Sequence, residues 1–190
     1  VVPRHDEGED QWSLEIDAIL PKGCSRSGLR FAATLLASRS PGGEELLSKS
    51  VALGAGERRL RLRVPRALAR RWSPEEPHLY GLRLELLVGR EVLDTVLSYA
   101  ALRTVRCQGD QVFLNGSPYF LRLVLDQGWY PGGLWTAPSP RAARMDIVRA
   151  QRLGFNGARC HQKVFQPAYF SHADALGFLC FAEYPDWPGG

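Results

Sequence analysis

The groups best suited to chemistry in this chain stand together at the end of one short apolar run, in the stretch FNGARCHQK. Residues 159 to 163 carry in turn a guanidinium, a thiol, an imidazole, an amide and an ammonium. Such groups bind ligands through hydrogen bonds and charge, and several of them titrate. Whether these groups bind a ligand depends on the fold, which must place the end of this run where a ligand can reach it.

Strands and helices alternate after about residue 104. Asn115-Gly116 predicts a hairpin, and three later apolar runs begin near Leu121, Phe155 and Phe178. Two helices are expected between these runs. The first has Ser139 as N-cap, Pro140 at its first position and Gly154 at its end, and the second ends at Gly177. This order predicts parallel strands joined by right-handed crossovers.

Polar residues follow each of these three runs. The first run ends at Asp126, the second in Arg159, Cys160 and His161, and the third at Glu183. Parallel α/β folds bind ligands beyond the carboxyl ends of their strands. We therefore expect the FNGARCHQK cluster to lie on the face that does chemistry.

A long loop after the first strand holds three aromatic residues, Trp129, Tyr130 and Trp135. Exposed aromatic rings near polar groups suit sugar recognition, because the apolar face of a sugar packs on a ring while its hydroxyls find hydrogen bonds. The alternative is that these rings only plug the mouth of a barrel. The residues themselves leave both interpretations open.

Arg159 and His161 also have two interpretations each. Arg159 could hold a ligand or orient a carboxylate, or it could form a structural ion pair with Glu183 or Asp126. His161 could contact substrate or take part in acid–base chemistry, or it could be an ordinary loop histidine.

Other chemistries fit the spacing badly. Cys160 and His161 are adjacent on a strand and point to opposite faces, so they do not form a nucleophile–base pair. His161, His172 and Cys160 match no zinc pattern, and no metal or cofactor is expected. Asp126 and Glu183, two strands apart, would be about 9–10 Å from each other. This is too far for the carboxylate pair of a retaining glycosidase and marginal for that of an inverting one.

The first hundred residues indicate a sandwich of two β-sheets. Apolar and polar residues alternate in short runs that turn-forming residues separate. The runs are Trp12 to Ile16, Leu29 to Leu35, Leu60 to Val64, Tyr80 to Val88 and Val92 to Tyr99.

The composition of the 190 residues is that of a globular protein, with 45% hydrophobic and 23% charged residues and a net charge of +4. Arg59, Arg61 and Arg63 alternate with apolar residues, which favours a solvated sheet face over nucleic-acid binding. No apolar run reaches the roughly 18 residues of a membrane span. Cysteines 24, 107, 160 and 180 form no C-x-x-C, so we expect buried thiols and a cytoplasmic location.

Four stretches in order resemble glycoside hydrolase family 2, the β-galactosidases, β-glucuronidases and β-mannosidases. They are RRWSPEEPHLYGLRLEL, LDTVLSYAALRTV, VFLNGSPYFLR and DIVRAQRLGFNGARCHQKVFQPAYFSHADALGFLCFAE. The resemblance covers essentially the whole chain. It implies an immunoglobulin-like sandwich over residues 1–103 and, over 104–190, the first three strands of a (β/α)8 barrel.

Family members are retaining enzymes that use two glutamates, and the resemblance places both beyond Gly190, so no catalytic residue is expected here. Arg159 matches the arginine of the family's Asn-x-x-Arg strand, and His161 resembles the histidine that follows it. Asp174 and Glu183 match positions that support the site from behind. The family's usual Arg-x-x-His-Tyr-Pro reads Arg-Cys-His-Gln-Lys here, with the histidine one place early.

These observations predict a piece of a retaining β-glycosidase, cut on its C-terminal side and inactive alone. Its partner is a carbohydrate, bound by Asp126, Arg159, His161 and the three aromatic residues of the loop, while the oligomeric state is left open. The alternative is a non-catalytic carbohydrate-binding or scaffolding protein built from the same domains.

Overall fold

The computed structural model describes residues 1–20, 27–40, 42–53 and 59–185, and Cys24 lies outside them. These residues form two compact units. The first unit contains Val1–Arg71 and His78–Thr104, and the second contains Trp72–Pro77 and the chain from Val105 onward. Each unit has its own buried core.

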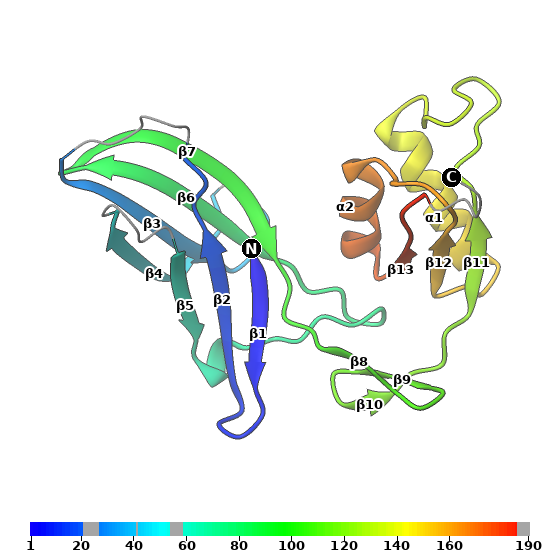
Figure 1. Cartoon of the computed structure of the whole chain (residues 1–190), viewed down its shortest axis with the longest axis horizontal. Coiled ribbons are helices and arrows are strands. Elements are labelled where there is room, and N and C mark those ends of the chain that lie inside the picture. The colour runs from blue at the N-terminus through cyan, green and yellow to red at the C-terminus, as the bar shows by residue number, and fades with distance from the viewer. Residues whose placement is uncertain (21–26, 41, 54–58, 186–190) are drawn as a thin grey trace. The chain divides into compact units, whose positions relative to one another are not determined.

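The first unit is built from two antiparallel sheets (Figure 1). One has the order β1-β2-β5, and the other has the order β4-β3-β6-β7. The bounds are β1 Val2–Asp6, β2 Gln11–Asp17, β3 Leu29–Leu36, β4 Glu45–Ala52, β5 Arg59–Val64, β6 Tyr80–Val88 and β7 Glu91–Ala100, with a 3-10 turn, η1, at Arg66–Leu68.

Alternating side chains explain this arrangement. In β5, Leu60, Leu62 and Val64 are buried, and the arginines between them are exposed. Trp12 and Leu14 of β2 point into the same core, where they meet apolar residues of β3 and β6. Burying one face of each strand against the other sheet is the main source of stability for such a sandwich.

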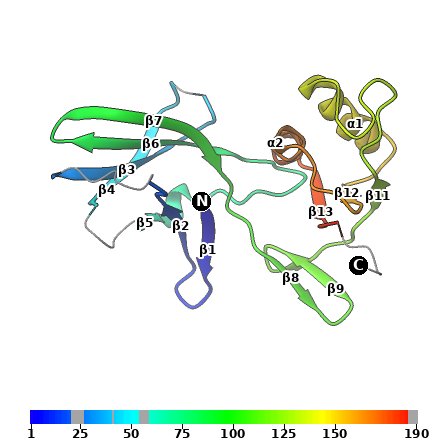
Figure 2. The same ribbon diagram turned by 45° about the horizontal axis from the view of Figure 1, so that its top comes forward.

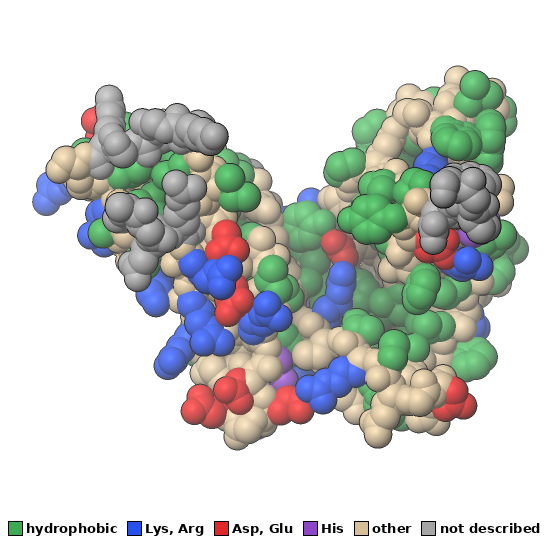
Figure 3. Space-filling model, viewed as in Figure 1, with side chains coloured by type: hydrophobic (Ala, Val, Ile, Leu, Met, Phe, Trp, Pro, Cys, Tyr) green, Lys and Arg blue, Asp and Glu red, His purple; other side chains and the backbone are tan. Residues whose placement is uncertain are grey.

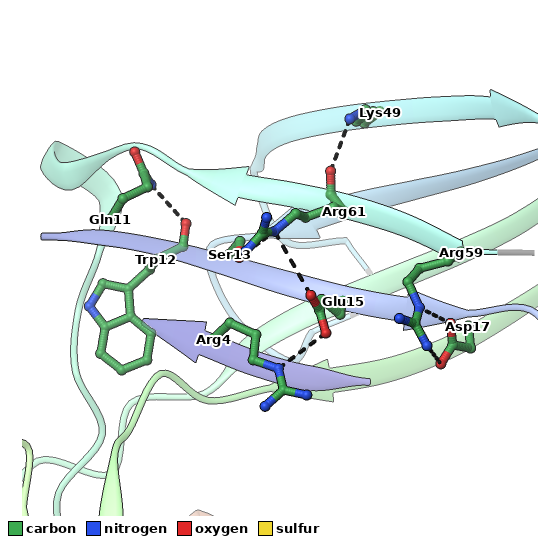
Figure 4. Close-up of polar contacts among 9 residues, drawn as sticks. All are labelled: Arg4, Gln11, Trp12, Ser13, Glu15, Asp17, Lys49, Arg59 and Arg61. Atoms are coloured by element: carbon green, nitrogen blue, oxygen red, sulfur yellow. Dashed lines mark hydrogen bonds and ion pairs between the residues drawn. The ribbon is translucent and has the colours of Figure 1, made fainter. Parts of the chain in front are cut away.

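The arginines of β5 lie on a polar sheet face, as the period-two pattern predicted. Arg59 pairs with Asp17, Arg61 donates to Ser13 Oγ at 3.1 Å, and Arg4 reaches Glu15 at 3.1 Å (Figure 4). In the space-filling view basic and acidic side chains lie next to one another on this part of the molecule (Figure 3). Mixed charge of this kind is typical of a solvated face.

The second unit begins with a small antiparallel sheet, β8 Val105–Gln108, β9 Gln111–Leu114 and β10 Ser117–Pro118. Asn115 and Gly116 join β9 to β10 with φ of 53° and 84°, values that a two-residue hairpin turn requires. The predicted hairpin is therefore confirmed, although the apolar run after it forms a separate strand.

That strand, β11 Leu123–Asp126, starts a parallel sheet with β12 Gly157–Cys160 and β13 Leu179–Ala182, in the order β11-β12-β13. The helices α1 Pro140–Arg152 and α2 Pro167–Leu176 connect these strands (Figures 1 and 2). The predicted helix signals are in place. Ser139 Oγ accepts the N–H of Ala142 at 3.1 Å, and Gly177 ends α2 with φ of 71°.

The segment Trp72–Pro77 leaves the sandwich sequence and packs in the second unit. The Trp72 side chain is fully buried, and its indole N–H donates to the carbonyl of Asp174 at 2.7 Å. The Asn115 side chain donates to the carbonyl of Trp72 at 2.9 Å. Asp174, expected to support the site, thus holds this segment through its main chain.

Burial corrects one expectation about the cysteines. Cys160 is buried and Cys180 is half-buried, but Cys107 is exposed. It lies in β8, whose four residues are all exposed. Over the described ranges, no helix is long and apolar enough to cross a membrane.

Replacing Gly177 with alanine tests how segment Trp72–Pro77 is held. A Cβ at Gly177 would lie 2.1 Å from the carbonyl oxygen of Pro74, and its positive φ disfavours any side chain. We expect Gly177→Ala to lower the free energy of unfolding of the second unit by more than about 2 kcal/mol. Urea denaturation measures this, with Gly132→Ala, where no atom lies within 4 Å of the added Cβ, as the control. Equal stability of both variants would contradict it.

Candidate functional site

The site is built on the carboxyl ends of the parallel strands. In the sheet, Asp126 lies opposite Cys160, which lies opposite Ala182. The N–H of His161 donates to the carbonyl of Asp126 at 2.8 Å, which extends the pairing by one bond. Asp126, His161 and Glu183 therefore follow neighbouring strand ends, as the sequence predicted.

Arg159 and Glu183 form the central ion pair of this face. Arg159 Nε donates to Glu183 Oε1, and the N–H of Gln162 donates to Oε2 at 3.1 Å. The hydrogen bond from Arg159 is the main reason why the pKa of Glu183 is lower than usual, and the Gln162 N–H adds to it. Glu183 is thus held as a carboxylate by two donors.

The same ion pair borders an open cavity. Arg159, Gln162, Glu183 and Tyr184 line a space of about 460 Å³. The side chain of Arg159 is 50% exposed, whereas that of Glu183 is 19% exposed. The two interpretations of Arg159 are therefore compatible, because it orients a carboxylate and also faces a space that could hold a ligand.

Asp126 uses both carboxylate oxygens within the protein. Oδ1 accepts the N–H of Gly128 at 2.7 Å, and Oδ2 accepts the hydroxyl of Tyr169 at 3.1 Å. Burial, together with the nearby Asp126 charge, raises the pKa of Tyr169, so this phenol stays a donor. Asp126 thereby shapes the turn with which the aromatic loop begins.

His161 and its neighbour Cys160 lie in different surroundings. Cys160 is buried against the helices with Ile147 and Phe178. His161 is half-exposed, and its Nδ1 lies 3.3 Å from Nε2 of Gln127. This difference agrees with side chains that point to opposite faces of the sheet.

The aromatic loop lies on the β11 side of the sheet. The rings of Trp129 and Trp135 meet edge to face, with centroids 5.7 Å apart, and each residue is 57% exposed. Tyr130 is bonded in both directions to the backbone of Leu134 at 2.8 Å. Burial, with Asp146 beside it, raises the pKa of the Tyr130 hydroxyl.

The predicted site residues fall into two groups. Trp129 lines a cavity of about 330 Å³ with Asp126, Tyr169 and residues of α1. Among the described residues, this cavity and the one at Arg159 have no lining residue in common. The structure thus joins Arg159 to Glu183, and it places Trp129 beside Asp126.

Sequence reasoning missed several residues that build this face. Asn156 is 7% exposed, and its side chain accepts the N–H of Arg122 at 2.7 Å and donates to the carbonyl of Phe120 at 2.8 Å. A buried polar residue within an apolar run was the available signal. Gln162 and Lys163 were seen only as part of the cluster, because nothing local shows which backbone groups they meet.

Two known glycosidases are similar to this chain in sequence. A putative β-glucuronidase of Formosa agariphila is 29% identical over 182 residues, 94% of this chain. A β-galactosidase of Thermoanaerobacter pseudethanolicus is 30% identical over 120 residues, 61% of this chain. The resemblance to glycoside hydrolase family 2 is thereby confirmed. This chain spans 16% of the length of each of these two proteins, and no protein-family model matches it.

Solved structures share the fold of this chain. A β-glucuronidase of Parabacteroides merdae superposes with a TM-score of 0.79 at 15% identity, over 97% of this chain and 23% of the other. A β-glucuronidase of Ruminococcus gnavus in complex with D-glucuronic acid gives 0.77 at 20% identity, over 96% and 29%. The described architecture, mostly β-sheet, is therefore that of β-glucuronidase structures.

Replacing Arg159 with methionine should raise the pKa of Glu183 toward the usual value for a glutamate, because its main charged donor is lost. A carbon-13 NMR titration of the Glu183 carboxyl measures this, and Arg149→Met, which removes a partner of Asp146, is the control. An unchanged Glu183 pKa in Arg159→Met would contradict the assignment.

The same shift sets a pH dependence. The pKa of Glu183 is lower in the folded chain than in the unfolded one, so the ion pair adds stability above the usual glutamate pKa. That stability is lost as the pH falls through the lowered pKa. The stability difference between the unsubstituted chain and Arg159→Met should therefore shrink in acid, which urea titrations at several pH values measure.

Proposed function

We propose that this chain supplies the sandwich and the first three strands of the (β/α)8 catalytic domain of a retaining β-glycosidase. The observation that carries the proposal is the Arg159–Glu183 pair, which borders an open cavity at the carboxyl ends of parallel strands. Barrel enzymes build their active sites on this face. A closed barrel has eight such strands in about 250 residues, so further strands are part of the proposal.

The substrate class follows from the relatives and from the site. Their printed names are β-glucuronidase and β-galactosidase, and one similar structure is a complex with D-glucuronic acid. We assign to this chain a β-linked glycoside, a glucuronide or a galactoside. Arg159 and His161, both partly exposed, would donate to hydroxyl or carboxylate oxygens of the sugar.

We assign the aromatic loop, which follows β11, to sugar binding as well. Trp129 and Trp135 expose apolar rings next to polar groups, which is what the faces of a pyranose require. Because the cavity at Trp129 is separate from the one at Arg159, the loop would contact a part of the glycoside away from the group held by Arg159.

Neither described carboxylate at the strand ends suits proton transfer to a leaving group. A general acid needs a raised pKa, whereas the pKa of Glu183 is lowered. Asp126 has both oxygens occupied by Gly128 and Tyr169. A retaining enzyme also needs its two carboxyl groups about 5–5.5 Å apart. We therefore assign the acid/base and the nucleophile to residues outside this chain, and propose that the 190 residues alone are inactive.

The second candidate is a carbohydrate-binding protein without catalysis. The exposed Trp129–Trp135 pair favours it, because such a pair can hold a sugar without any catalytic group. This candidate predicts that the protein binds a glycoside and leaves the glycosidic bond intact.

The test compares this chain with the full-length gene product on nitrophenyl β-glucuronide and nitrophenyl β-galactoside. We expect hydrolysis only by the full-length protein, with NMR showing that the first product has the β configuration. In that protein, Arg159→Ala should lower kcat/KM by about 100-fold, the scale of two charge-assisted hydrogen bonds. Arg144→Ala, an exposed arginine of α1 that lines neither of these two cavities, is the matched control.

Three results would count against the proposal. Turnover by the 190-residue chain would place catalytic groups within it, and a first product in the α configuration would exclude retention. Binding of both glycosides by the full-length protein without any hydrolysis would favour the second candidate.

A further inference from the structure

Lys163 joins the end of β12 to the aromatic loop. Its ammonium donates to the carbonyl of Gly128 at 3.2 Å and to the carbonyl of Trp135. These two acceptors stand at the beginning and at the end of the segment 128–135. One side chain therefore closes this segment across its two ends.

The lysine lies in a space shaped to receive it. Gly128 is buried with φ of +63°, and a Cβ there would lie 2.7 Å from Nζ of Lys163 and 3.1 Å from Cζ of Phe165. The ammonium lies 4.9 Å from the centroid of the Phe165 ring, a cation–π distance. Only a glycine at position 128 allows this approach.

Electrostatics fit a half-buried lysine whose ammonium is held by groups of the protein. Burial lowers the pKa of Lys163, and the charge of Asp126 acts in the opposite direction. The Asp126 carboxylate in turn fixes the N–H of Gly128. The start of the loop is thus held by an acceptor for its N–H and a donor for its carbonyl.

The loop that Lys163 closes carries the two exposed tryptophans. Within this segment the backbone bonds of Tyr130 and Leu134 fold the chain, and directly after it the N–H of Thr136 donates back to the carbonyl of Gly133. Trp129 directly follows one anchored carbonyl, and Trp135 carries the other. The edge-to-face contact of the two rings therefore depends on both ends staying together.

We propose that Lys163 is a positioning residue, which holds Trp129 and Trp135 as one rigid surface for the sugar ring of a β-glycoside. This rests on the proposed function, because it takes the loop as part of the glycoside site. Lys163 does not touch the sugar, since its ammonium is directed at backbone carbonyls. A compact ammonium with three donors suits two converging carbonyls better than a planar guanidinium.

The substitution Lys163→Met keeps most of the apolar stem and removes the donors. Its matched control is Lys49→Met in the sandwich, where Lys49 also donates to a backbone carbonyl, that of Arg61 at 3.0 Å. Lys163→Gln, a milder change that keeps two N–H donors, serves if the methionine variant does not fold. Trp72, buried in the same unit, is the internal reference for folding.

The first readout is the indole N–H signals of Trp129 and Trp135 in nitrogen-15 NMR spectra of this chain. We expect both to shift and broaden in Lys163→Met and to stay in place in Lys49→Met, with the Trp72 signal unchanged in each. Unchanged Trp129 and Trp135 signals in Lys163→Met would overturn the proposal. This readout needs no substrate.

The second readout is hydrolysis of nitrophenyl β-glucuronide and nitrophenyl β-galactoside by the full-length gene product. We expect Lys163→Met to raise KM about tenfold and to leave kcat within about twofold, because a misplaced platform weakens binding more than chemistry. Mobile indole signals with an unchanged KM would overturn the link to sugar binding. If the unsubstituted protein hydrolyses neither glycoside, the proposed function fails, and the indole signals alone decide whether Lys163 holds the loop.

Discussion

The parallel pairing of β12 with both of its neighbours is the constraint on which the site depends. Gly157 opens this strand, and a Cβ there would lie 2.5 Å from the carbonyl of Leu179 and 2.6 Å from a methyl of Leu123. The three strands can pair in this register only because that position has no side chain. Asn156, one residue earlier, bonds to Phe120 and Arg122 and fixes how β11 enters the sheet.

This register determines where the polar groups at the strand ends lie. A parallel sheet brings all of its carboxyl ends to one edge, so Asp126, His161 and Glu183 become neighbours although they are far apart in sequence. Arg159 is the last exposed residue of β12 before the buried Cys160. It can therefore reach across to Glu183 after β13, and the ion pair follows from strand order and alternation.

The sequence predicted those features that a few neighbouring residues decide. Alternation placed Leu60, Leu62 and Val64 inside the sandwich, and Ser139 and Gly177 marked helix ends where the structure has them. The strands β1 and β4 were missed, because Val2–Asp6 contains a proline and charged residues, and because every residue of Glu45–Ala52 stays exposed or half-buried. Their strand character comes from pairing with β2 and β3.

The candidate site was predictable as a set of residues and less so as an arrangement. Strand ends identified Arg159 and Glu183. The path of the loop with Trp129 depends instead on backbone turns at Gly128 and Leu134, both with positive φ. The partners of Lys163 could not be read locally either. A lysine side chain has four rotatable bonds, and only the folded loop shows which carbonyls it meets.

Most of the described charged side chains at the carboxyl ends of the strands form hydrogen bonds with groups of the protein. Arg159 bonds to Glu183, Lys163 bonds to two carbonyls, and Asp126 bonds to Gly128 and Tyr169. Groups held in this way resist reorientation, and fixed dipoles stabilise a developing charge without first having to turn toward it. A carboxylate that must exchange a proton during turnover needs the opposite, a pKa free to lie near the working pH. Glu183, whose pKa is lowered, does not meet this requirement, and two donors fix its carboxylate, as two donors fix that of Asp126.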